Sequence, residues 1–246
     1  MPTRTRSGAA KRTAARRPAA SAPPVRRPRE SDAEKRTRAT LILERLRSEH
    51  GSAHAFLHAD DPLQTLVATM LSAQCTDAMV NRVTPALFAR CARVEDYATI
   101  PRAELERLVH RTGFYRAKAR NVQLMARALL ERHGGEVPRT MEELHALPGV
   151  GRKTANVVLG NAYGLVEGVC VDTHVGRLAR RMDLTRWADP VKVERDLMTR
   201  LPRAWWWEAT YLLISHGRAV CAARRPACAT CPVRDLCPRK GVLHPR

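Results

Sequence analysis

The stretch "LPGVGRKTANVVLG", residues 147–160, places a Pro-Gly-Val-Gly turn before an apolar run that opens with Arg152 and Lys153. The capping pattern of "TMEELHAL", residues 140–147, predicts a helix before the turn. Glycines let the backbone approach a ligand closely, and the free N–H groups at the start of the second helix favour an anion. The stretch therefore predicts two helices joined by a tight hairpin turn that suits a DNA phosphate. A purely structural hairpin would carry the same pattern.

The same stretch does not fit a nucleotide-binding P-loop. That motif needs four residues between its first glycine and a Gly-Lys-Ser/Thr, and it follows a strand. Here one residue separates Gly149 from Gly151, Arg152 stands before Lys153, and a helix is expected upstream. Nucleotide binding of this kind is therefore excluded.

The rest of the chain indicates an all-α fold of about ten helices, because apolar residues recur at helical spacing and no segment alternates with a period of two. Polar caps and glycine stops bound these segments. Helix signals begin at Ser31, Asp61, Pro101, Tyr115, Thr140 and Asp189. The most apolar run is interrupted at Asn156, Asn161 and Glu167, so no membrane-spanning helix is expected.

The net charge of +19 is unevenly placed. Residues 1–38 hold 12 Lys/Arg and three acids, and the remaining chain holds 31 and 21, which gives +9 and +10. Because both parts are basic, a polyanion, most simply nucleic acid, is the expected partner. Residues 1–30, rich in Arg, Ala and Pro, are expected to form a disordered basic arm, and an organelle transit peptide has a similar composition.

Four of the seven cysteines fall close together with the spacing C-x6-C-x2-C-x5-C. They are Cys221, Cys228, Cys231 and Cys237. With no secretory signal, clustered thiolates argue for a metal centre rather than disulfides. A single C-x2-C knuckle favours an iron–sulfur cluster but leaves zinc open. The other three, Cys75, Cys91 and Cys170, are expected to be buried thiols.

Together these motifs resemble those of the endonuclease III family of DNA glycosylases. The hairpin stretch is followed in the family's order by "VDTHVGRL", residues 171–178, and "HGRAVCAARRPACATCPVRDLC", residues 216–237. Upstream, "LSAQCTD" and "TGFYRAKARN" match as well. The resemblance covers roughly residues 33–240 and implies a [4Fe–4S] cluster held by the four clustered cysteines.

The resemblance also implies two helical domains that flank a DNA-binding cleft. One, residues 55–166, would be a six-helix barrel that carries the hairpin. The other would join residues 31–54 to residues 167–246 and hold the cluster.

Family resemblance implies that Lys153 is the nucleophile and Asp172 the catalytic carboxylate. The lysine amine would attack C1′ of a damaged nucleotide, displace the base and form a Schiff base that collapses by β-elimination. An arginine cannot do this because its guanidinium stays protonated, and only six of the 43 basic residues are lysines. Asp172 would stabilise positive charge on the sugar and assist proton transfers. In a plainer interpretation Lys153 clamps a phosphate and Asp172 caps a helix.

Further residues are expected to contact DNA. The resemblance places Gln74 in the gap left by an extruded base and Phe114 as an apolar wedge between base steps, although either could simply be a packing residue. The remaining expected contacts are to phosphates. They come from the hairpin residues Gly149, Val150, Gly151 and Arg152 and from the cysteine-loop residues Arg224 and Arg225.

The resemblance implies a bifunctional DNA glycosylase/AP lyase that excises oxidised pyrimidines from duplex DNA. It would act as a monomer on damaged bases or abasic sites, in the cytoplasm on the bacterial nucleoid and without a membrane. The family's adenine-mismatch branch lacks a lysine at position 153 and carries a further C-terminal domain, whereas this sequence ends nine residues after Cys237. A pyrimidine-dimer glycosylase and a non-enzymatic DNA-binding hairpin module would also carry these motifs. The connection from Lys153 to Asp172 is one residue longer than the family's usual pattern.

Overall fold

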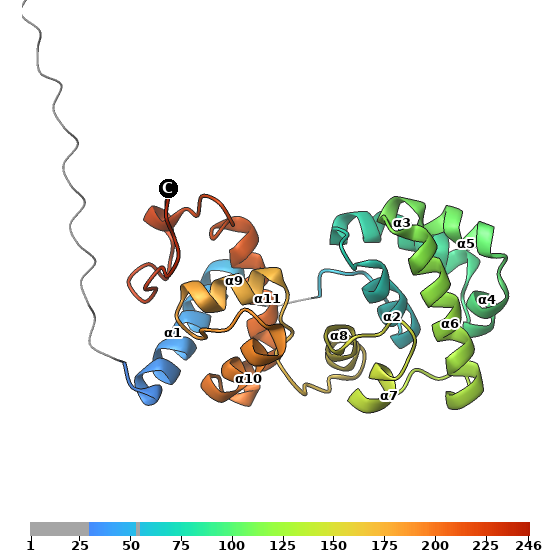
Figure 1. The fold of residues 1–246 in the computed structure, drawn as a ribbon, viewed down its shortest axis with the longest axis horizontal. Helices are drawn as coiled ribbons and strands as arrows, with labels where there is room; N and C mark the ends of the chain where they lie inside the picture. The colour runs from blue at the N-terminus through green and yellow to red at the C-terminus, as the bar shows by residue number, and fades with distance from the viewer. Residues whose placement is uncertain (1–29, 53–54) are drawn as a thin grey trace, which may run out of the picture. The chain divides into compact units, whose positions relative to one another are not determined.

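The computed structural model describes residues 30–52 and 55–246, and in these ranges every regular element is a helix (Figure 1). The all-α prediction is confirmed for them. The basic arm expected over residues 1–30 lies, apart from Glu30, outside the described residues. Within the described ranges, no helix is long and apolar enough to cross a membrane.

The described chain contains α-helices joined by short loops and three single 3₁₀ turns. In chain order they are α1 (Asp32–His50), α2 (Pro62–Leu71), α3 (Asp77–Arg90), α4 (Val94–Thr99), α5 (Arg102–Val109), η1 (His110–Thr112), α6 (Tyr115–His133), α7 (Met141–His145), α8 (Arg152–Tyr163), α9 (Thr173–Arg181), α10 (Pro190–Arg200), η2 (Arg203–Trp205), α11 (Trp206–Ala219) and η3 (Cys228–Thr230).

The helix boundaries follow the capping chemistry of the sequence. At the start of α1 the Glu34 N–H donates to the Ser31 hydroxyl at 3.2 Å, and the Ser31 N–H donates to the Glu34 carboxylate at 2.7 Å. This is the predicted capping box. Asp61 caps α2, Thr140 caps α7, and α6 ends at Gly134 in a left-handed conformation.

Two hydrophobic cores divide residues 31–246 into two helical domains. The first core lies among α2 to α8, and its fully buried side chains include Leu66, Leu87, Leu105, Met125 and Leu159. The second joins α1 to α9, α10 and α11, and includes Ile42, Leu46, Leu178, Leu197 and Leu213. Burying each such side chain stabilises the fold by about 1.5–3 kcal/mol. In Figure 1 the blue helix α1 accordingly packs with the orange α11, although the whole first domain separates them in sequence.

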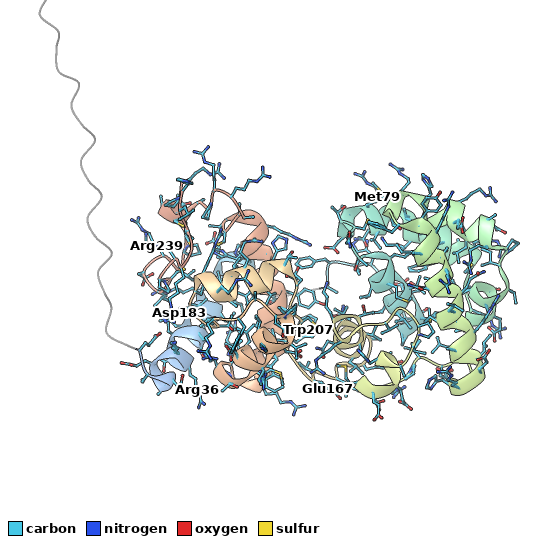
Figure 2. The ribbon with its side chains drawn as sticks, in the orientation of Figure 1. Arg36, Met79, Glu167, Asp183, Trp207 and Arg239 are labelled. Carbon is cyan, nitrogen blue, oxygen red and sulfur yellow. The ribbon has the colours of Figure 1, made fainter. Side chains whose placement is uncertain are left out.

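A hydrogen-bonded aromatic pair joins the two domains. The Asn161 Oδ1 on α8 accepts from Trp207 Nε1 at 3.2 Å and from the Tyr211 hydroxyl at 2.8 Å, both on α11. Trp207, labelled in Figure 2, approaches α8 so closely that a Cβ at Gly160 would lie 2.7 Å from its ring. A second link is the ion pair between Asp77 of α3 and Arg218 of α11, at 2.5 Å.

Gly160→Ala should lower the free energy of unfolding, because the new Cβ would overlap the Trp207 ring. Such overpacking costs about 1–3 kcal/mol and works against a gain in helix propensity of about 1 kcal/mol. Gly176→Ala in α9 is the matched control, since the nearest side-chain atoms to its Cβ would lie 3.7 Å away. It should raise the free energy of unfolding. Urea denaturation of both variants makes the comparison, and changes of the same sign would contradict the packing argument.

Candidate active site and nucleic-acid interface

The turn between α7 and α8 brings the N-terminus of α8 to the protein surface. Gly149 has a φ of 77°, in the left-handed region that favours glycine. A Cβ at this position would also lie 2.8 Å from the Cβ of Asn121 on α6. Both requirements fall on one residue, so a glycine is needed here for the backbone to turn and to pack against α6.

The turn leaves the first N–H groups of α8 available to a ligand. Gly151 is the N-cap of α8 and has no side chain with which to cap it. A Cβ at Gly151 would meet no atom within 4 Å, and Arg152 is exposed beside it. Val150 differs, because its side chain is buried in the first core and its N–H donates to the Leu147 carbonyl at 3.1 Å. Val150 therefore has no free donor for the expected phosphate contact, since its carbonyl oxygen, like a phosphate oxygen, only accepts.

The charges of Lys153 and Asp172 both act on one buried thiol, that of Cys170. Lys153 is the exposed second residue of α8, and Asp172 lies just before α9. Burial raises the pKa of the Cys170 thiol to about 12, with the Lys153 cation acting in the opposite direction. The negative charges of Glu194 and Asp172 raise it further. One cation and two carboxylates thus act electrostatically on Cys170, which stays a neutral thiol at neutral pH.

Asp172 is held in place by its own helix. Its Oδ1 accepts a hydrogen bond from the Val175 N–H at 2.8 Å, which caps α9. The irregular connection 164–172 begins at Gly164, whose left-handed backbone ends α8. The cap fixes the carboxylate of Asp172 relative to the first turn of α9.

Glu194 is a buried carboxylate that sequence analysis missed. It lies on α10, is 6% exposed, and accepts from Arg152 Nε at 2.8 Å and from Arg152 Nη2 at 3.2 Å. Its Oε1 also accepts from Asn156 Nδ2 at 3.1 Å. These bonds tie the second domain to the first turn of α8. The available signal was an acid between Val193 and Leu197, on the apolar side of an amphipathic helix.

Glu194→Gln should lower the free energy of unfolding by about 1.5–3 kcal/mol, because a neutral amide cannot replace the charged acceptor for Arg152. Glu95→Gln is the matched control: its ion pair with Arg93 is solvent-exposed, and its loss should change stability little. Chemical denaturation of the two variants tests this. An effect of Glu194→Gln no larger than that of Glu95→Gln would mean that the buried pair does not hold the domains together.

Gln74 and Phe114 are both exposed residues with a left-handed backbone. Their φ angles are 52° and 47°, and Phe114 is 66% exposed. Among the other described non-glycine residues only Asp183 and Arg239 share this conformation. It costs of order 1–3 kcal/mol and concentrates at functional sites. The two expected DNA-probing residues are thus presented on strained turns, a property that no sequence pattern indicated.

The four clustered cysteines surround one cavity. Cys221, Cys228, Cys231 and Cys237 all line it. In the part of the chain that the structure describes, no three His, Cys, Asp or Glu side chains are grouped so as to hold one metal ion. Four thiols that line one cavity are the donor set that a polynuclear iron–sulfur group takes.

Burial and hydrogen-bond donors around the sulfurs support this fit. Burial raises the pKa of Cys237 to about 11, so a cationic group is needed to hold it as a thiolate. Arg181 Nη1 lies 3.2 Å from Cys221 Sγ. His216 is fully buried with Nε2 3.4 Å from Cys231 Sγ, and burial lowers its pKa to about 4. A neutral His216 can therefore donate from Nε2 to the sulfur.

The loop between the first two cluster cysteines presents two arginines. Arg224 and Arg225 are exposed there. Arg181, on α9 and 8% exposed, holds the loop by donating to the carbonyls of Ala222 at 2.8 Å and Ala223 at 2.6 Å. The same helix therefore begins beside Asp172 and ends under this loop.

The remaining cysteines were predicted only in part. Cys91 and Cys170 are buried, as expected. The prediction was wrong for Cys75, which is partly exposed because it lies in the turn that presents Gln74.

Comparison with known proteins places this site in a family. Residues 67–203 match the HhH-GPD superfamily of base excision DNA repair proteins. Endonuclease III of Synechocystis sp. is 52% identical over 206 residues, which cover 84% of this chain and 94% of that protein. The Bacillus subtilis endonuclease III is 45% identical over 202 residues, 82% of this chain and 91% of that one. A trapped covalent endonuclease III–DNA intermediate superposes with a TM-score of 0.78 at 42% identity, over 82% of this chain and 95% of that chain.

The chain belongs to the endonuclease III family within the HhH-GPD superfamily of base excision DNA repair proteins. It is a DNA glycosylase with AP lyase activity that acts on oxidised pyrimidines in base excision repair. The resemblance drawn from the sequence motifs is thereby confirmed.

Proposed function

We propose that Lys153 and Asp172 carry out the excision chemistry of this enzyme. The supporting observation is that Lys153 is exposed in the first turn of α8 and that its charge acts on the Cys170 thiol, as does that of the capping residue Asp172. The open N-terminus of α8 adds a positive dipole end, which favours the phosphate beside the reacting sugar.

The proposed reaction breaks the N-glycosidic bond first and then the bond to the 3′ phosphate. The neutral Nζ of Lys153 attacks C1′ of the damaged nucleotide, and the base leaves with the electrons of the N-glycosidic bond and takes up a proton. Opening of the sugar ring gives a protonated Schiff base at Lys153. Loss of a C2′ proton then expels the 3′ phosphate in β-elimination, and water releases the lysine. Asp172 stabilises the positive sugar and relays protons.

We propose that the DNA backbone binds at the α7–α8 turn and at the cysteine loop. Gly149 and Gly151 allow a phosphate to reach the α8 N-terminus, and Arg152 stands beside them with a side chain that is 43% exposed. Arg224 and Arg225 offer bidentate guanidinium groups to further phosphates.

Gln74 and Phe114 are proposed to act within the duplex. Extruding a base costs a few kcal/mol, and an amide that fills the gap can bond to the opposite base. An exposed aromatic ring can insert as a wedge between base steps and hold the DNA bent. The exposure and strained backbone of both residues support these roles.

We propose that the four clustered cysteines hold a [4Fe–4S] cluster. When bound, the cluster supplies a rigid, four-point anchor that shapes the segment from Cys221 to Cys237. All four iron positions would be taken by cysteine, so its part is structural and DNA-positioning. Arg181 and His216 are the residues that would donate hydrogen bonds to its ligands.

The proposed partner is duplex DNA with damaged bases or abasic sites, bound by a monomer on the bacterial nucleoid. We assign residues 55–166 to the barrel domain and residues 31–54 with 167–246 to the cluster domain. The two cores support this division.

Lys153→Gln should abolish strand cleavage of duplex DNA that carries thymine glycol, by a factor on the order of 10³ or more, because the nucleophile is lost. Lys153→Arg, which keeps the charge, should be equally inactive. Lys192→Gln on α10 removes an exposed lysine outside the site and should cleave normally. Gel assays measure product, and fluorescence anisotropy checks that DNA affinity persists. Wild-type cleavage by either Lys153 variant would refute the proposed role.

Cys231→Ser should remove the brown colour and bound iron of the purified protein and weaken DNA binding, because the cysteine loop loses its anchor. Cys75→Ser, at a partly exposed cysteine outside the cavity, should keep the colour and the bound iron. Visible absorption and iron analysis make the comparison. A colourless wild-type protein that carries zinc would contradict the cluster assignment.

A further inference from the structure

Lys118 is a buried lysine that the proposed chemistry does not use. It lies one turn into α6, is 7% exposed, and is one of only six lysines in the chain. Burying an ammonium is costly unless it is well hydrogen-bonded, and lysines are seldom buried without such a partner. A cation retained in the core of the first domain therefore needs a specific reason.

The ammonium joins two segments that are far apart in sequence. Lys118 Nζ donates to the Leu71 carbonyl at 2.8 Å and to the Thr112 carbonyl at 2.7 Å. Leu71 is the last residue of α2, where carbonyl groups lack partners within the helix. Thr112 ends the 3₁₀ turn η1. The Lys118 N–H also donates to the Phe114 carbonyl at 3.0 Å.

Each of the two segments leads directly into a DNA-probing residue. Gln74 follows Leu71 by three positions, in a turn closed by the Cys75 N–H to the Ser72 carbonyl at 3.0 Å. Phe114 follows Thr112 by two positions, after Gly113 with a φ of 71°. One ammonium thus holds together the two segments that lead into the strained turns.

The chemistry of lysine suits this task. A compact ammonium on a flexible stem can reach two carbonyls on different turns, whereas the planar fork of arginine needs acceptors in one plane. A methionine of similar length would fill the space but donate to neither carbonyl. The two turns would then be joined only by packing.

We propose that Lys118 is a positioning residue that sets the spacing between Gln74 and Phe114, so that both enter the duplex when one nucleotide is extruded. The inference rests on the roles proposed above for these two residues. Lys118 acts through them and touches neither the sugar nor the base.

The test separates duplex probing from the lyase chemistry. Lys118→Met is compared with wild type, with Gln74→Ala and Phe114→Ala, and with Lys192→Met as the control at an exposed lysine. Each protein is assayed for cleavage of duplex thymine glycol DNA and of a single-stranded abasic oligonucleotide, which has no opposite strand to probe. Fluorescence of 2-aminopurine opposite the lesion reports insertion into the duplex.

We expect Lys118→Met to lose at least about tenfold in duplex cleavage and most of the 2-aminopurine signal, as misplaced groups do. Cleavage of the single strand should stay within about twofold of wild type. Gln74→Ala and Phe114→Ala should show the same division, and Lys192→Met should match wild type. Duplex cleavage by Lys118→Gln, whose amide can still donate to one carbonyl, should fall between that of wild type and that of Lys118→Met. If Lys118→Met does not fold, Lys118→Gln takes its place in the test.

Other results overturn one claim or the other. Equal losses on both substrates by the Lys118 variant, or no loss, would show that Lys118 only stabilises the domain. Absence of a duplex-specific loss in Gln74→Ala and Phe114→Ala would instead refute the roles proposed for those residues.

Discussion

The backbone at Gly149 is the constraint on which the proposed active site depends. A left-handed conformation and a close approach to Asn121 meet at this residue, so the turn can bring the α8 N-terminus against α6 only with a glycine there. That placement exposes the first N–H groups of α8 and sets Lys153 at its second position. The proposed phosphate binding and the proposed amine chemistry therefore share one helix end, whose position the turn determines.

Residues of the second domain hold elements of the proposed site in place through hydrogen bonds and ion pairs. Glu194 of α10 binds Arg152 in the first turn of α8, and Arg218 of α11 binds Asp77 shortly after the Gln74 turn. Helix α9 begins at the capped Asp172 and ends where Arg181 holds the cysteine loop. The proposed catalytic carboxylate and the loop that carries Arg224 and Arg225 are consequently held by the two ends of one helix. Polar contacts between the domains thus position groups that the chemistry requires to be near each other.

Local signals in the sequence predicted most of the fold, since caps at Ser31, Asp61 and Thr140 bind the groups that their spacing indicated. The confirmed family resemblance came from the hairpin, aspartate and cysteine motifs. Buried polar residues such as Glu194 and Lys118 were not predicted, because their partners lie 42 and up to 47 positions away. Long-range hydrogen bonds leave no periodic pattern. Backbone strain at a non-glycine residue is likewise imposed by tertiary contacts.

Identifying the lysine that bonds to DNA tests whether Lys153 is the nucleophile. The enzyme is incubated with abasic duplex DNA and sodium borohydride, which reduces a Schiff base to a stable amine. The adduct is then digested and the modified residue located by mass spectrometry. The account predicts a deoxyribose remnant on Lys153 and on none of the other five lysines. A remnant on another lysine or on the α-amino group would contradict it, because the helix end would then serve only to bind phosphate.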